Sequence, residues 1–237
     1  MRIDVITIFP ELFVPSLTIG MIERARRKGS LEVRLHDLRG FTEDRHRSVD
    51  DRPYGGGPGM LLKPEPVFRA MDLLGSGPEG ERGFLPILLC PQGRRLDQEG
   101  LQELSEQEHL LLLCGRYEGF DERICTGFPW RRYSIGDFVL SGGEVPALVI
   151  IEGIARLLPG VLGHEESATR DSFSEWAGGS EGLDHPHFTR PPSYRGREVP
   201  EVLRSGNHEA IEAWRRRESA AASRRRAEGA DPDHDSN

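Results

Sequence analysis

Residues 110–163 read LLLLCGRYEGFDERICTGFPWRRYSIGDFVLSGGEVPALVIIEGIARLLPGVLG, and this stretch decides the fold class. Its apolar start predicts a buried strand that ends at Cys114 and Gly115, where a polar loop follows. A glycine-rich turn then leads into an apolar helix. Glycine lets the backbone approach a ligand closely, and loops just beyond buried strands carry the ligand sites of α/β folds. The pattern alone is compatible with a ligand site or with two structural turns.

The composition indicates one large domain, or one domain with a smaller appendage. The chain has 237 residues, of which 36% are hydrophobic and 30% are charged. No apolar run approaches the roughly 20 residues that a bilayer requires, and the N-terminus lacks the pattern of a secretory signal. We therefore expect a cytoplasmic protein without a membrane partner. Three cysteines, Cys90, Cys114 and Cys125, are expected to be reduced and structural.

The charge distribution is asymmetric along the chain. The formal net charge is −8, which argues against a general binder of polyanions, yet residues 190–226 carry ten arginines and five glutamates. A basic run of this kind is either a solvated face or an electrostatic site for phosphates.

The chain begins with a β-α-β pattern. Residues 2–9 are rich in β-branched side chains and predict a buried strand, residues 11–28 have helical spacing, and residues 31–38 alternate as a half-exposed strand does. Residues 41–64 then interrupt this alternation of strands and helices, and they contain the glycine cluster YGGGPG. This cluster lacks the lysine and serine or threonine of a phosphate-binding P-loop, so we interpret it as a long functional loop.

The rest of the chain predicts further alternating elements and then a second domain. Strands are expected at residues 84–90 and 109–114, and helices at 65–74, 97–108, 144–158 and 207–227. The helix at 144–158 is apolar nearly all round, which predicts burial. We expect an α/β domain at residues 1–163, a flexible linker at 164–182, a helical domain at 183–228 and a disordered tail at 229–237.

Seven motifs occur in the order of one known family. They are DDRPYGGGPGM (50–60), PQGRRLDQ (91–98), LCGRYEGFDERI (113–124), SIGDFVLSGGE (134–144), LPGVLG (158–163), DSF (171–173) and HPHFTRP (185–191). Over residues 1–217 the chain closely resembles the bacterial tRNA (guanine-N1)-methyltransferases of the TrmD family, which belong to the SPOUT superfamily.

The resemblance implies a SPOUT fold: a mostly parallel sheet with helices on both faces and a C-terminal trefoil knot, followed by a small helical domain. It also implies that three loops bind S-adenosylmethionine. The implied cofactor residues are Leu88, Leu89, Cys90, Gln92, Gly115, Tyr117, Glu118, Gly119, Ile135, Gly136, Asp137, Phe138, Val139, Leu140, Gly142 and Gly143. Loops of this composition suit a nucleoside, which is bound by shape and backbone hydrogen bonds.

The resemblance further implies methylation of N1 of the guanosine at tRNA position 37, immediately 3′ of the anticodon. Asp171 is implied as the base that takes the N1 proton, and Arg156 as the cation that stabilises charge on O6. Both residues also have structural interpretations, because Asp171 can cap a turn and Arg156 can pair with Glu152.

Further partners follow from the same resemblance. Glu118 matches a position linked to magnesium, and the active site is implied to be shared between the protomers of a homodimer. The anticodon stem-loop is the expected RNA partner. Its contacts are expected from His46, Asp50, Arg52, Tyr54 and Arg190, with phosphates held by the basic C-terminal stretch.

Three other functions compete with this interpretation. One is a SPOUT methyltransferase that acts on another RNA, and another is an RNA-binding protein without catalysis. The third is a thiol hydrolase built on Cys114, for which no histidine is placed as an obvious partner.

Overall fold

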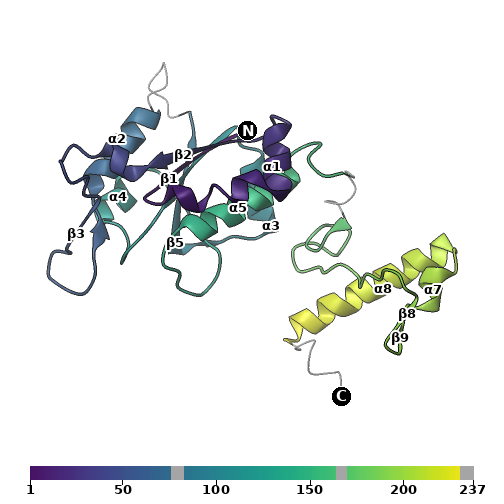
Figure 1. The fold of residues 1–237 in the computed structure, drawn as a ribbon. Helices are drawn as coiled ribbons and strands as arrows, with labels where there is room; N and C mark the ends of the chain where they lie inside the picture. Colours follow the sequence, from purple (N-terminus) through teal and green to yellow (C-terminus); the bar gives the residue numbers. More distant parts are fainter. Residues whose placement is uncertain (76–82, 164–169, 230–237) are drawn as a thin grey trace. The chain divides into compact units, whose positions relative to one another are not determined.

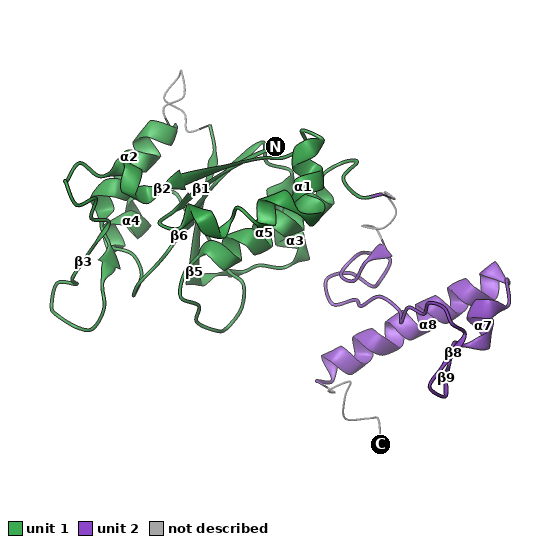
Figure 2. Ribbon diagram, in the orientation of Figure 1, with its two compact units in different colours: residues 1–162 green, residues 163–237 purple. Residues whose placement is uncertain are grey.

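The computed structural model describes residues 1–75, 83–163 and 170–229. The chain divides into two compact units, Met1–Leu162 and Gly163–Asn237, which Figure 2 shows in different colours.

Unit 1 is built on a five-stranded, all-parallel sheet with the order β2-β1-β6-β5-β7 (Figure 1). Its strands are β1 (Arg2–Thr7), β2 (Glu32–Asp37), β5 (Leu85–Arg95), β6 (His109–Cys114) and β7 (Arg131–Ser134). Its helices are α1 (Gly20–Arg27), α2 (Pro64–Gly75), α3 (Gln98–Ser105), α4 (Glu122–Gly127) and α5 (Glu144–Leu157). The predicted α/β fold with a mostly parallel sheet is therefore confirmed.

Helices cover both faces of this sheet because its central strands are apolar on both sides. Along β6, Leu110 and Leu112 pack into a core with α1, α3 and α5, whereas Leu111 and Leu113 pack into a second core with α2 and α4. Figure 1 shows α1, α3 and α5 grouped together and α2 and α4 apart from them. The continuous leucine run thus reflects a strand buried on both faces.

The predicted helix at residues 11–28 is wrong as a single element. The structure has the short 3-10 helices η1 (Pro10–Leu12) and η2 (Ser16–Thr18) before α1 begins at Gly20. Gly20 has φ +66°, a left-handed conformation that interrupts a continuous helix. The helix end at residues 26–29 is where the cations and glycine predict it.

Two other elements differ from their predicted form. Strand β5 continues through the predicted loop at residues 91–95 and pairs again with β7 at Arg94 and Arg95, after an irregularity that begins at Leu89. Helix α5 is not buried all round, since Val145 is 57% exposed and Val149 is 42% exposed. Part of the apolar surface of α5 is therefore exposed on unit 1.

Short elements complete the part of unit 1 that the structure describes. The 3-10 helix η3 (Leu38–Phe41) follows β2, and β3 (Asp50–Asp51) pairs antiparallel with β4 (Leu61–Leu62) across the glycine cluster. Asp97, the first residue of the predicted helix at 97–108, caps α3, because its side chain accepts a 2.8 Å hydrogen bond from the Gly100 amide.

Unit 2 consists of turns, a small hairpin and a long helix. Its elements are β8 (Ser193–Tyr194), β9 (Arg197–Glu198), α7 (Glu201–Arg204) and α8 (His208–Ala227). Asn207 caps α8 as predicted, through a 3.2 Å bond from the Ala210 amide to its side chain. Residues 164–169 of the predicted linker and residues 230–237 of the predicted tail lie outside the described residues, as do residues 76–82.

The predicted knot stays a prediction.

No helix among the described residues has both the length and the apolar character that crossing a bilayer requires.

One buried carboxylate ties three strands of the sheet together. Asp4 on β1 has no exposed surface and contacts His36 of β2 at 2.6 Å, His109 of β6 at 2.5 Å and Arg2 at 2.7 Å. Burial raises the pKa of Asp4, but the hydrogen bonds from His36 and His109, with the charges of His36 and Arg2, lower it more. The pKa of Asp4 in the folded chain therefore lies below the ordinary value of 3.8.

We expect Asp4 to stabilise the fold in a pH-dependent way. Its lowered pKa means that the folded chain binds fewer protons there than the unfolded chain. The stabilisation is complete above pH 3.8 and is lost as the pH falls through the lower folded-state pKa. Asp4→Asn should reduce the free energy of unfolding at neutral pH by about 3 kcal/mol. Denaturant titrations at several pH values measure this.

The control is Glu32→Gln, which alters an exposed pair with Arg34 on the adjacent strand β2 and should have a much smaller effect. Equal losses for the two variants would contradict the role of Asp4.

Candidate functional site

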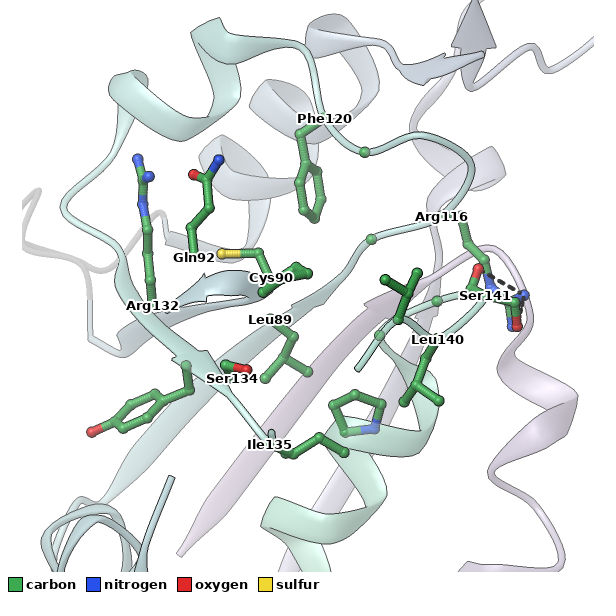
Figure 3. Close-up of a pocket in the computed structure, with 18 of the residues that line it drawn as sticks. Leu89, Cys90, Gln92, Arg116, Phe120, Arg132, Ser134, Ile135, Leu140 and Ser141 are labelled. Atoms are coloured by element: carbon green, nitrogen blue, oxygen red, sulfur yellow. Dashed lines mark hydrogen bonds between the residues drawn. The ribbon is translucent and has the colours of Figure 1, made fainter. Parts of the chain in front are cut away.

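The irregular stretch of β5 at residues 89–92 and the loops that follow β6 and β7 surround one cavity of about 440 Å³ (Figure 3). Parallel strands bring such loops to the same edge of a sheet, where α/β folds bind ligands. Figure 3 shows Leu89, Phe120, Ile135 and Leu140 around this cavity, together with the polar groups of Gln92, Ser134 and Arg132.

Most of the implied cofactor residues line this cavity. They are Leu89, Cys90, Gln92, Gly115, Tyr117, Glu118, Gly119, Ile135, Gly136, Phe138, Val139, Leu140, Gly142 and Gly143. Two are not among the lining residues: Leu88, which packs in the core beside α2 and α4, and Asp137. The roles of all of them remain predictions.

Ten further residues line the cavity. They are Pro91, Arg116, Phe120, Glu122, Cys125, Arg132, Tyr133, Ser134, Ser141 and Pro146. Pro91, Arg116 and Ser141 lie within the three loops that the resemblance implies for the cofactor, residues 88–92, 115–119 and 135–143, whereas the other seven lie outside these loops. Cys125 belongs to α4 and Arg132 to β7. These two short elements were not predicted, because the sequence between Ile124 and Tyr133 has no clear hydrophobic period.

Glu144, the first residue of α5, anchors the loops that form the cavity. Its side chain is 1% exposed. It accepts a 2.7 Å hydrogen bond from Thr7 Oγ1 at the end of β1 and a 2.9 Å ion-pair contact from Arg116 Nε after β6. Arg116 also lies over the Phe9 ring, 4.7 Å from its centroid. The carboxylate thus fixes the ends of two neighbouring strands to the start of the helix.

Close backbone contact holds the glycine turn against the loop after β6. The Gly143 amide donates a 2.9 Å bond to the Gly115 carbonyl. A Cβ atom at Gly143 would lie 2.8 Å from Cys114 Cα and 2.9 Å from the Gly115 amide nitrogen, so any larger residue would separate the two loops. The glycine is required here by the approach of two backbones.

The loop after β6 is also joined to the glycine cluster near residue 59. The Glu118 amide donates to the Met60 carbonyl at 3.0 Å, and the Leu62 amide donates to the Gly119 carbonyl at 2.9 Å. The Glu118 side chain occupies the space that a Cβ atom at Gly59 would need. The stretch implied in RNA binding and a loop implied in cofactor binding are therefore packed as one structure.

Tyr117 connects these two stretches through its side chain. It has φ +62°, a conformation that costs free energy for a residue with a side chain and that occurs most often at functional sites. Its hydroxyl interacts with Asp50 and Arg39, and burial together with the charge of Asp50 raises its pKa. The strained residue thus carries a phenol that stays protonated and donates its hydrogen bond to the Asp50 carboxylate.

The implied RNA-binding residues occupy exposed positions, with one exception. His46, Arg52 and Tyr54 are exposed in unit 1, and the Tyr54 side chain is 100% exposed. Asp50 is half-buried in β3, where it interacts with Tyr117. Arg190 is exposed in unit 2.

The two implied catalytic residues belong to different units. Arg156 is exposed in the last turn of α5. Asp171 is half-buried in a turn of unit 2, where its carbonyl accepts a 3.3 Å bond from the Ser174 amide and the adjacent Phe173 amide bonds to the Gly182 carbonyl at 2.7 Å. The segment that carries Asp171 therefore has local hydrogen-bonded structure.

The environment of Cys114 argues against a thiol hydrolase. The residue is 2% exposed, and burial, with a smaller contribution from Glu144, raises the pKa of its thiol well above the ordinary value. A nucleophilic cysteine requires an accessible thiolate with a lowered pKa. Cys114 has the opposite properties and behaves as a small apolar residue of the core.

Comparison with known proteins assigns the family. The family model described as tRNA (Guanine-1)-methyltransferase TrmD matches residues 1–230. A tRNA (guanine-N(1)-)-methyltransferase of Moorella thermoacetica is 50% identical over 226 residues, covering 95% of this chain and 88% of the relative.

Two further relatives carry the same name. The protein of Bacillus licheniformis is 49% identical, with 92% of this chain and 87% of the relative covered. The protein of Persephonella marina is 51% identical, with 91% of this chain and 82% of the relative covered. The match extends through both units, and this chain therefore belongs to the TrmD family of tRNA (guanine-1)-methyltransferases.

Proposed function

We propose that this chain transfers the methyl group of S-adenosylmethionine to N1 of the guanosine at position 37 of tRNA, immediately 3′ of the anticodon. Family membership carries the reaction class, because relatives at about half identity are named tRNA (guanine-N(1)-)-methyltransferases. The observation that supports the proposal most directly is the single cavity that the three implied cofactor loops surround.

The cavity suits S-adenosylmethionine in size and in chemistry. Its volume of about 440 Å³ lies in the range of small-molecule sites. Leu89, Ile135 and Leu140 offer apolar surface for an adenine ring, and the glycines at 115, 119, 142 and 143 keep part of the cavity wall free of side chains. When bound, S-adenosylmethionine supplies an electrophilic methyl group.

The guanine must lose its N1 proton as the methyl group arrives, and negative charge then develops on O6. Asp171 is assigned to accept this proton, which a carboxylate within hydrogen-bond distance is able to do. Arg156, permanently charged and exposed at the end of α5, is assigned to stabilise the charge on O6.

The anticodon stem-loop is the proposed RNA partner. Residues 46–54 of unit 1 are bonded to the cofactor loop through Asp50 and Tyr117, which favours them for positioning the anticodon loop near the cavity. In α8 of unit 2, Arg215, Arg216, Arg217 and Arg224 add positive charge that suits contacts with phosphates. Such contacts supply affinity and salt dependence more than sequence choice.

A homodimer with a shared active site is the proposed assembly. Apolar side chains are exposed beside the cavity, with Phe138 at 54%, Val139 at 88% and Val145 at 57% exposure. Exposed apolar side chains of this kind favour contact with another protein surface, and a second copy is the commonest partner. In the proposed dimer, the partner protomer contributes Asp171.

The substrate assignment predicts a strict dependence on one nucleotide. With labelled S-adenosylmethionine, a tRNA transcript with guanosine at position 37 should accept the label, and a transcript with adenosine there should accept none. Equal labelling of the two transcripts would show that the enzyme acts on another position or another RNA.

The base assignment predicts that Asp171→Asn loses turnover and keeps cofactor binding. Loss of a general base lowers the rate by about 10²- to 10⁴-fold. Single-turnover methylation measures the rate, and calorimetry measures the affinity for S-adenosylmethionine. Glu175→Gln, an exposed neighbour in the same segment, is the matched control and should retain the rate. Turnover retained by Asp171→Asn would remove Asp171 from the base role.

Magnesium is a further proposal, with Glu118 as its protein ligand. Glu118 is exposed beside the cavity and offers one carboxylate, so water or substrate would supply most of the six ligands that magnesium takes. Glu118→Gln should therefore remove the stimulation of single-turnover methylation by magnesium. Glu99→Gln, exposed in the first turn of α3, should keep it. Stimulation unchanged in Glu118→Gln would assign the ion elsewhere.

A further inference from the structure

A cluster of three side chains in unit 2 has the composition of a transition-metal site. Asp184, His185 and His187 each offer one ligand atom, and these atoms all lie within 4.8 Å of one another. His185 Nδ1 is 2.6 Å from Asp184 Oδ1, and His187 Nε2 is 2.8 Å from Asp184 Oδ2. Two imidazoles and a carboxylate form a donor set that zinc and similar dications bind well.

Neighbouring residues hold two of these side chains in place. The His185 side chain is 11% exposed and packs edge-on against the rings of Trp176 and Trp214, with centroids 5.8 and 6.1 Å away. The Asp184 side chain is 20% exposed, and its backbone amide donates a 3.0 Å bond to Ser172 Oγ. A site formed by packed side chains loses less conformational entropy when it binds an ion than one formed by mobile side chains.

The third side chain leaves the cluster accessible. His187 is 70% exposed, so an ion has a route to the cluster from solvent, and a water molecule or another external ligand has room to complete its coordination. Protein sites with three ligands and one open position are common for zinc.

A second cluster of the same composition in unit 1 provides an internal comparison. Asp4 also lies between two histidines, His36 and His109, but Arg2 contacts the same carboxylate at 2.7 Å and places a positive charge there. In the part of the chain that the structure describes, the cluster at residues 184–187 is the one group of three such residues whose ligand atoms converge. Composition alone thus does not distinguish the two clusters, whereas geometry and charge do.

We propose that Asp184, His185 and His187 bind a divalent transition-metal ion, with zinc as the representative ion. The carboxylate would bind through one oxygen, His185 through Nδ1 and His187 through Nε2. Each imidazole stays neutral and carries its proton on the other ring nitrogen, so the two contacts to Asp184 give way to bonds to the metal.

The position of the ion gives it a structural consequence. Leu183, the residue before the cluster, donates through its amide to Ser223 Oγ at 2.9 Å and accepts from Ser219 Oγ at 2.6 Å, both on α8. Because Asp184 also bonds to Ser172, an ion there would join the turn at residues 171–174, residues 183–187 and α8. We therefore expect the ion to stabilise unit 2 against local unfolding.

Calorimetric titration of the metal-free full-length protein with zinc tests the proposal directly. One zinc ion should bind per chain in the micromolar range or tighter, and the unfolding temperature should rise with zinc concentration. Absence of saturable binding, or binding without any change in thermal unfolding, would overturn the proposal.

A paired variant separates metal binding from hydrogen bonding. In His185→Asn/His187→Gln, the side-chain amide nitrogens replace Nδ1 and Nε2 as donors to Asp184 but bind zinc poorly. This variant should fold with an unchanged circular dichroism spectrum and should lose zinc binding by at least about tenfold. The control, His208→Gln, changes an exposed histidine in the first turn of α8 and should bind zinc like the unmodified chain.

Equal zinc binding by the paired variant and the unmodified chain would place the ion elsewhere and overturn the assignment. If the paired variant does not fold, cobalt bound to the unmodified chain decides the question. Visible absorption bands typical of nitrogen and oxygen ligands in a site of low coordination number support the proposal, and the spectrum of hexaaqua cobalt contradicts it.

Discussion

Glu144 accepts hydrogen bonds from Thr7 and Arg116 while it is almost wholly buried at the first turn of α5, and the cavity depends on this interaction. The carboxylate joins residues that are 137 positions apart in the chain. Removing one partner of such a buried pair typically costs about 3–5 kcal/mol, because the remaining charge has no compensation. Without it, the loop after β6 and the turn before α5 would depend on the backbone contacts at Gly142 and Gly143 and on the weaker bonds of Arg116 to Ser141.

Local patterns predicted most of the first unit because its elements differ clearly in hydrophobic period. The leucine run of β6 and the caps at Asp97 and Asn207 required no knowledge of distant residues. The errors arose where tertiary contacts override local signals. A left-handed Gly20 divides a helical pattern, and β5 continues through Gly93 because β7 is there to pair with it. The strand and helix around residues 122–134 lack a clear period and were missed.

The candidate site was predictable as a set of loops but not as a set of contacts. Glycines and strand ends indicated where the loops lie, and the motifs indicated which family uses them. The pairing of Glu144 with Thr7, and the bonding of Tyr117 to Asp50 and Arg39, depend on the positions of residues that are remote in sequence. Conversely, Asp184, His185 and His187 are neighbours in sequence, yet only the structure indicates that their ligand atoms converge.

Glycines form part of the cavity wall, and this has a consequence for inhibition. Gly142 and Gly143 border it, and a side chain at either position would collide with Arg116 or with the Cys114 backbone. A competitive inhibitor that packs against these two glycines therefore contacts backbone atoms that a single substitution cannot remove. Resistance would have to arise at lining side chains such as Leu89 or Ile135, or outside the cavity, where substitutions are less costly to the fold.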